Sequence, residues 1–204
     1  MKKYKYFLIG FLLFLSVLTT WNPLFPHDQL LQHIGTLGLV IILIHDAQTS
    51  KQWLGFLGIF GFTVLHIIGA RYVYSNVPYY EWFPSLFSYT ERNHFDRFVH
   101  LGFGFLIFPY LFQFVSKWGI SSIFKTLLIT WMMLQSMSLI YELLEWNLTL
   151  MASPEDAETY NGQQGDLWDA QKDMALALLG STFVGLIYLF FNFRKNKHNT
   201  LQKT

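Results

Sequence analysis

The stretch "GDLWDAQKDMALALLGSTFVGLIYLFF", residues 165–191, places three aspartates directly before a long apolar run. A run of about 20 apolar residues is long enough to cross a bilayer as a helix. Asp166, Asp169 and Asp173 follow one another at i, i+3 and i+7, so they share one face of that helix. The stretch therefore predicts a membrane-spanning helix with carboxylates at one mouth.

The composition extends this prediction to the whole chain. The 204 residues are 52% hydrophobic and 19% aromatic, and only 13% are charged, whereas soluble domains average about 25% charged residues. We therefore expect a single integral membrane domain over residues 1–204. The net charge of +1 gives no sign of nucleic-acid binding. The chain has no cysteine, which excludes disulfides, thiolate nucleophiles and cysteine-ligated zinc.

Six apolar stretches predict an all-α, polytopic membrane bundle with six transmembrane helices. The expected spans are residues 6–21, 30–45, 53–74, 96–115, 122–146 and 169–193, of which the second is the shortest. The first stretch has a basic start but no small-residue cleavage site before "WNPLFP", so we interpret it as a retained helix.

Basic residues predict the orientation of these helices. With six spans and both termini inside, ten of the 14 Lys and Arg residues fall on the cytoplasmic side, which favours cytoplasmic termini. The same topology gives two long outer connections, residues 75–95 and 147–168. We expect a multi-pass protein of the bacterial cytoplasmic membrane, in contact with membrane lipids.

Ionisable residues gather at the predicted outer ends of four helices. Asp96 and His100 are four residues apart and share one face of the fourth span. Glu142 and Glu145 are three apart and share a face of the fifth. The remaining members are His66 and Arg71 on the third span and the three aspartates on the sixth. On the inner side, only His45 and Asp46 stand beside a short loop.

Helix capping explains part of this pattern. Asp166 and Asp169 fit the first turn of a helix, where carboxylates suit the helix dipole. His100 and Asp173 lie two turns further in, where a charge is costly and is by default a sign of function. Glu142 and Glu145 lie near a helix C-terminus, where the dipole disfavours anions. A bound cation, a neighbouring arginine or protonation must offset their charge.

The residue types favour a divalent cation. Carboxylates with one or two histidines suit Mg, Mn or Zn. In an enzyme with such a site we expect four residues as metal ligands: Asp96, His100, Glu142 and Asp173. Glu145 or Asp169 would serve as the catalytic general base. Arg97, Lys172 and Arg71 are the candidates for binding an anionic headgroup.

Two other functions use the same residues. The carboxylates could form a proton or cation pathway in a transporter, which needs polar residues that continue to the inner side. Only Thr130, Gln135 and Ser136 continue along the fifth span, so we rank transport second. A structural module held by ion pairs ranks third, because the acids outnumber the nearby bases.

Four motifs resemble those of the YjdF-type family of small bacterial inner-membrane proteins, which carry domain of unknown function 2238. They are "GARYVYSNVP" (69–78), "ERNHFDRFVHLGFG" (91–104), "YELLEW" (141–146) and "GDLWDAQKDMALALLG" (165–180). The resemblance implies no established activity. Its pattern falls on Asp96, Arg97, His100, Glu142, Glu145, Trp146, Asp166, Asp169, Gln171, Lys172 and Asp173. One departure is Arg71, where the family pattern has a histidine.

A more distant similarity, carried by "DRFVH" and Glu142, is to VanZ-like membrane proteins. That resemblance implies chemistry of the cell envelope, on a lipid or a cell-wall precursor. The hypothesis from the sequence is therefore an envelope protein that is a cation-dependent lipid hydrolase or a binder of lipid groups. Whether it is an enzyme is left open.

Overall fold

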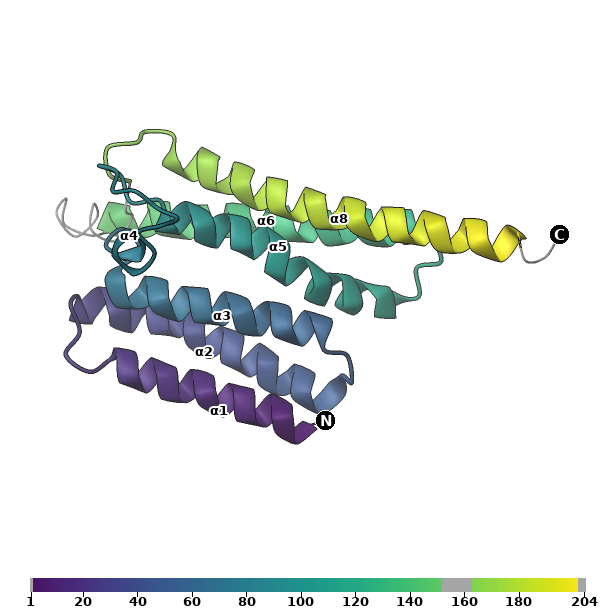
Figure 1. Ribbon diagram of the computed structural model, residues 1–204, viewed down its shortest axis with the longest axis horizontal. Helices are drawn as coiled ribbons and strands as arrows, with labels where there is room; N and C mark the ends of the chain where they lie inside the picture. The colour runs from purple at the N-terminus through teal and green to yellow at the C-terminus, as the bar shows by residue number, and fades with distance from the viewer. Residues whose placement is uncertain (1, 152–162, 202–204) are drawn as a thin grey trace.

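The computed structural model describes residues 2–151 and 163–201, and these ranges are helical apart from their connections. The elements are α1 (Lys2–Thr19), α2 (Pro26–Thr49), α3 (Leu54–Tyr72), α4 (Tyr79–Trp82), α5 (Phe95–Val115), a 3-10 turn (Ser116–Trp118), α6 (Ile123–Met151) and α8 (Asp169–Leu201). The long helices run up and down, and the start of α1 and the end of α8 lie at the same end (Figure 1). We call the opposite end of the bundle the mouth. Of the predicted connection 147–168, residues 152–162 lie outside the described residues.

Five helices in the described ranges are long and apolar enough to cross a membrane, namely α2, α3, α5 with its 3-10 turn, α6 and α8. This confirms the all-α, multi-span architecture. Helix α1, which includes Lys2, Lys3 and Lys5, is not among them, so the sixth span and the side of the termini stay predictions. Helix α2 has 24 residues and extends beyond the predicted 30–45, because Pro26 and Asp28 provide a favourable first turn.

Helix α5 lies at the centre of the bundle and packs against α3, α6 and α8. Its contact with α8 is close because two glycines face each other. A Cβ atom on Gly104 would lie 2.3 Å from the carbonyl oxygen of Ala177, and one on Gly180 would lie 2.6 Å from that of Leu101. Small residues let helix backbones approach closely in membranes. On this face of α5, His100 and Asp96 follow Gly104 one and two turns towards the mouth.

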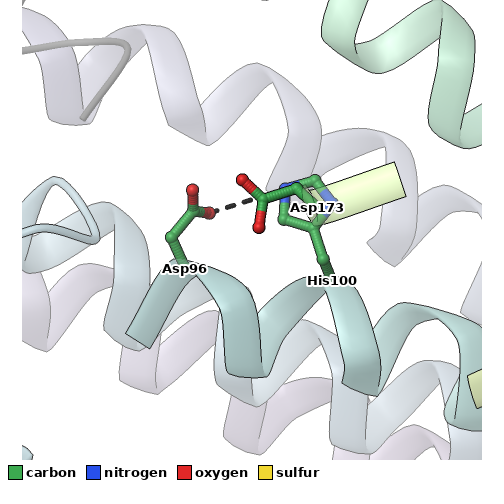
Figure 2. A group of neighbouring side chains, drawn as sticks. All are labelled: Asp96, His100 and Asp173. Atoms are coloured by element: carbon green, nitrogen blue, oxygen red, sulfur yellow. Dashed lines mark ion pairs between the residues drawn. The ribbon is translucent and has the colours of Figure 1, made fainter. Parts of the chain in front are cut away.

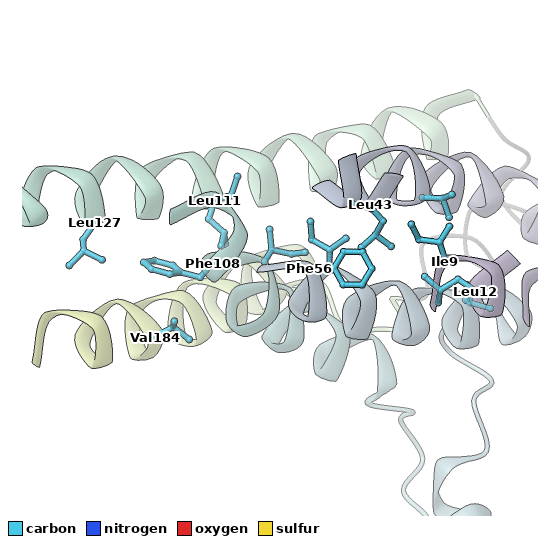
Figure 3. Packing of buried hydrophobic residues seen from close by; sticks show 14 residues of the cluster. Ile9, Leu12, Leu43, Phe56, Phe108, Leu111, Leu127 and Val184 are labelled. Atoms are coloured by element: carbon cyan, nitrogen blue, oxygen red, sulfur yellow. The ribbon is translucent and has the colours of Figure 1, made fainter. Parts of the chain in front are cut away.

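Apolar side chains fill the half of the bundle opposite the mouth, where α1 starts and α8 ends. Phe108 and Leu111 of α5 belong to one cluster with Leu127 of α6, Val184 of α8 and Phe56 of α3 (Figure 3). Phe56 and Phe108 are fully buried. Apolar side chains therefore make up most of the packing in this half of the bundle, where Thr126 and Thr130 are also buried.

A buried ion pair ties α1 to the rest of the bundle at the end opposite the mouth. Lys5 Nζ donates to Asp46 Oδ2 (2.6 Å) and to the carbonyl oxygens of Gln52 (2.8 Å) and Ser50 (3.1 Å). Both side chains are almost inaccessible to solvent. Asp46 is therefore ion-paired with a lysine 41 residues earlier in the chain.

The close α5–α8 contact predicts that one methyl group added at Gly104 destabilises the protein. Gly104→Ala should lower the free energy of unfolding in detergent by about 1–3 kcal/mol, because the helices must separate. Gly38→Ala is the matched control, since its added Cβ meets no atom within 4 Å. Thermal unfolding of both variants measures the difference. An equal loss in the two variants would contradict a glycine-dependent contact.

Candidate functional site

Three helices bring four of the predicted ligands together near the mouth. Asp96 and His100 come from α5 and Asp173 from α8, and their side chains point towards one another (Figure 2). One ligand atom from each lies within 4.8 Å of the other two. His100 Nε2 is 3.6 Å from Asp96 Oδ1 and 3.5 Å from Oε1 of Glu142, on α6. The structure thus places the four residues predicted from sequence in one cluster.

One oxygen on each of two carboxylates in this cluster is buried without a hydrogen-bond partner among the described residues. Asp173 is 2% exposed and Glu142 is 8% exposed. Among the described residues, Asp173 Oδ1 and Glu142 Oε1 accept no hydrogen bond. Leaving a buried polar group unsatisfied costs about 1–3 kcal/mol, and more for a charged one. The two oxygens therefore need a cation, a proton or a water molecule.

A small cavity lies between these carboxylates. Its volume is about 10 Å³, and its lining includes Asp96, Glu142, Glu145, Asp169 and Asp173. A cavity of about 10–15 Å³ holds one water molecule, and a metal ion of similar or smaller size also fits. We call Asp96, His100, Glu142, Glu145 and Asp173 the carboxylate cluster.

A second layer of charges covers the cluster at the mouth, and here acids and bases are paired. Arg97 Nη2 donates to Asp166 Oδ2 (2.6 Å) and lies 3.4 Å from Asp169 Oδ1. Arg92 donates to Asp169, and Lys172 Nζ lies 2.5 Å from Asp166 Oδ2. Three basic side chains thus meet two carboxylates in this layer. The carboxylate cluster beneath it has four acids, with His100 as its one basic side chain.

Two groups at the mouth, outside the spanning helices, have shifted pKa values. Hydrogen bonds from the Lys172 ammonium and the Trp168 backbone, with help from Arg97, lower the pKa of Asp166 to about 2. Partial burial, then the charges of Arg97 and Arg92, lower the pKa of His94. A neutral His94 can accept the hydrogen bond from Arg97 Nη1 to its Nδ1, at 3.3 Å.

Reasoning from the sequence missed the residues that join the segment before α5 to the segment before α8 at the mouth. Asn93 donates its backbone N–H to Gln164 Oε1 (2.8 Å), and Gln164 Nε2 donates back to the Asn93 carbonyl oxygen (3.0 Å). Arg92 also donates to the carbonyl oxygen of Gln163. The only signal for Arg92 in the sequence is its place in the charged segment before α5, because its partners lie more than 70 residues away.

The other predicted residues take different positions. Arg97 and Lys172 are both paired with Asp166, so an anionic headgroup would compete with that carboxylate. Arg71 lies in the last turn of α3, where its Nη1 is buried without a hydrogen-bond partner among the described residues. Asp169 lines the small cavity but also pairs with Arg92. The roles assigned to these residues stay predictions.

Comparison with known proteins matches a family over most of the chain. The profile described as "Predicted membrane protein (DUF2238)" matches residues 4–195. Inner membrane protein YjdF of Escherichia coli (strain K12) is 25% identical over 192 residues, which cover 89% of this chain and 88% of the relative. No solved structure matches the chain. With five apolar helices, these findings confirm a multi-pass protein of the cell membrane, while the similarity to VanZ-like proteins stays a prediction.

The lowered pKa of Asp166 predicts a pH dependence of stability. An unfolded aspartate titrates near pH 3.9, so the stabilisation from Asp166 is complete above that value. It is lost as the pH falls from about 4 to about 2, because the unfolded chain binds the proton first. The difference in melting temperature between wild type and Asp166→Asn should therefore shrink across this range.

Thermal unfolding in detergent at a series of pH values measures that difference, and contributions from other acids cancel between the two proteins. Glu91→Gln, at an exposed position, is the control and should follow the wild type. A difference for Asp166→Asn that is independent of pH would contradict the ion-paired layer.

Proposed function

The chain belongs to the DUF2238 family of predicted membrane proteins, and we propose that its carboxylate cluster holds one divalent cation for chemistry on a lipid of the cell envelope. The ligands are Asp96, His100, Glu142 and Asp173. Glu145 and Asp169 line the same small cavity next to the ion.

The observation that carries this proposal is that two buried oxygens, Glu142 Oε1 and Asp173 Oδ1, accept no hydrogen bond among the described residues. Two like charges 4 Å apart repel by about 4 kcal/mol at an effective dielectric constant of 20. The basic side chains at the mouth are paired with Asp166 and Asp169, so they are already engaged in the layer above. A divalent ion would satisfy both oxygens and offset the repulsion.

The geometry is compatible with direct ligation. Donors bound to one ion at about 2.1 Å lie at most about 4.2 Å apart. The donors of Asp96, His100 and Asp173 lie within 4.8 Å of one another, so small rotations of the side chains suffice. Three carboxylates and one imidazole favour Mg, Mn or Zn over softer ions.

In the hydrolase form of this proposal, the lipid is an ester and Glu145 is the general base. The ion would supply Lewis-acid activation of the attacking water and of the ester carbonyl. Glu145, which lines the same small cavity, would take the proton of that water as it adds to the carbonyl carbon and would return the proton to the alcohol oxygen as the ester bond breaks. The products are a carboxylic acid and an alcohol. In the binder form, the ion and its ligands hold the lipid group without this step.

Transport of a proton or cation through the same carboxylates ranks second. A path from the cluster to the chain ends would run past Phe108, Leu127 and Val184, which pack together (Figure 3). The Thr126 and Thr130 hydroxyls on α6 donate to the carbonyl oxygens of Ser122 and Thr126, one turn earlier (3.1 and 2.8 Å). This packing supports a site that is closed towards the end of the bundle opposite the mouth.

Metal analysis tests the proposal directly. Protein stripped with a chelator and dialysed against Mn²⁺ should hold about one ion per chain, and excess ion should raise its stability by about 2.7 kcal/mol at 100 times the dissociation constant. Glu142→Gln and Asp173→Asn should lose both effects. Glu91→Gln, at an exposed acid, should keep them.

The same variants separate a lost ligand from a lost fold. Without metal, Asp173→Asn should melt higher than the wild type, because it removes a buried, unpartnered charge. No ion in the wild type after dialysis against Mn²⁺, Mg²⁺ and Zn²⁺ in turn would overturn the proposal. So would full Mn²⁺ content in both site variants.

A further inference from the structure

A second, larger cavity adjoins the carboxylate cluster. Its volume is about 220 Å³, and its apolar lining includes Leu39, Phe62, Val99 and Phe103. Asp96 and His100 of the cluster also line it, so one end of the cavity reaches the proposed cation ligands. We call this space the apolar cavity. A mostly apolar lining with Asp96 and His100 at one end suits an amphiphilic ligand.

The apolar cavity lies between two groups of helices. Helix α2 packs against α1 and α3, whereas α6 packs against α5 and α8, yet both α2 and α6 line the cavity (Figure 1). On these two helices the lining residues Gly35 and Met137 are exposed. All four lining helices are membrane-spanning candidates, so the surroundings of this rim are lipid hydrocarbon. A chain can therefore reach the cavity sideways from the bilayer.

Two further polar side chains of the lining, His66 and Tyr74, are hydrogen-bonded to each other. His66 Nε2 donates to the Gln32 carbonyl oxygen (3.0 Å), because that oxygen can only accept. In a neutral imidazole, Nδ1 then accepts the hydrogen bond from the Tyr74 hydroxyl (2.5 Å). Tyr74 reaches His66 by folding over Gly69, where a Cβ would lie 2.4 Å from the tyrosine ring. His66 and Tyr74 thus add hydrogen-bonding groups to the lining, and neither carries a permanent charge.

Cationic side chains are absent from the lining of the apolar cavity within the described part of the chain. Arg92, Arg97 and Lys172 are held in the layer at the mouth by Asp166 and Asp169. Without a bound cation, an anionic group in the apolar cavity would thus meet the Asp96 carboxylate and no lysine or arginine among the described lining residues. In the metal-free protein, charge complementarity therefore favours an uncharged polar end.

We infer that the apolar cavity binds a single-chain lipid whose polar end is an uncharged hydroxyl or ester, and that this lipid comes from the bilayer between α2 and α6. The polar end lies at Asp96 and His100, and the chain passes between Gly35 and Met137. The inference rests on the proposed function only for the cation beside that polar end.

Two probes with the same chain test the charge selectivity. Monooleoylglycerol is uncharged, and oleoylglycerol phosphate differs from it only by an anionic phosphate. Native mass spectrometry of the full chain, stripped of metal with a chelator and kept in detergent, should show one bound monooleoylglycerol, with binding about tenfold weaker for the phosphate. Equal or tighter binding of the phosphate would overturn the inference.

Substitutions at the rim test the location. Met137→Trp and Leu39→Trp fill the apolar cavity from α6 and from α2, and each should weaken monooleoylglycerol binding by about tenfold. Ile140→Trp, at an exposed position of α6 outside the lining, is the matched control and should bind as the wild type does. Binding of wild-type strength in both cavity variants would overturn the inference.

The Mn²⁺ content of the wild type and the same variants, measured after dialysis against Mn²⁺, separates the two proposals. Met137→Trp should keep its Mn²⁺ while it loses the lipid, because residue 137 does not line the small cavity. Selective monooleoylglycerol binding by a wild type that holds no Mn²⁺ would support the lipid site and reject the cation site. Mn²⁺ binding without monooleoylglycerol binding would do the reverse.

Discussion

The contact between α5 and α8 at Gly104 and Gly180 is the constraint on which the rest of the site depends. Because neither residue has a side chain, the two backbones approach closely enough for Gly104 to face the carbonyl oxygen of Ala177. The next turns towards the mouth then place His100 and Asp96 against Asp173. A wider crossing would separate these side chains and let water enter between them.

Charge is sorted by depth in this arrangement. At the mouth, Arg92, Arg97 and Lys172 neutralise Asp166 and Asp169. Beneath them, the buried carboxylates have His100 as the one basic side chain of their cluster, and beside the cluster lies a mostly apolar cavity that Asp96 and His100 also line. This unsatisfied negative charge next to an apolar space is the basis of the proposed cation site.

Sequence reasoning predicted the parts of this structure that depend on local spacing. The apolar runs predicted the helices, and intervals of four residues put Asp96 and His100 on one face. It did not predict the Lys5–Asp46 pair or the hydrogen bond from Tyr74 to His66. The first joins residues that are far apart in the chain. The second needs left-handed backbone at Val73 and Tyr74, a conformation that valine and tyrosine do not predict.

Anomalous X-ray scattering from crystals grown with Mn²⁺ tests the central claim most directly, because it locates the ion without assuming its ligands. The account predicts one strong peak within about 2.3 Å of carboxylate oxygens of Asp173 and Glu142 and of the His100 ring. A peak confined to Asp166 and Asp169 at the mouth, or no peak between α5, α6 and α8, would contradict it.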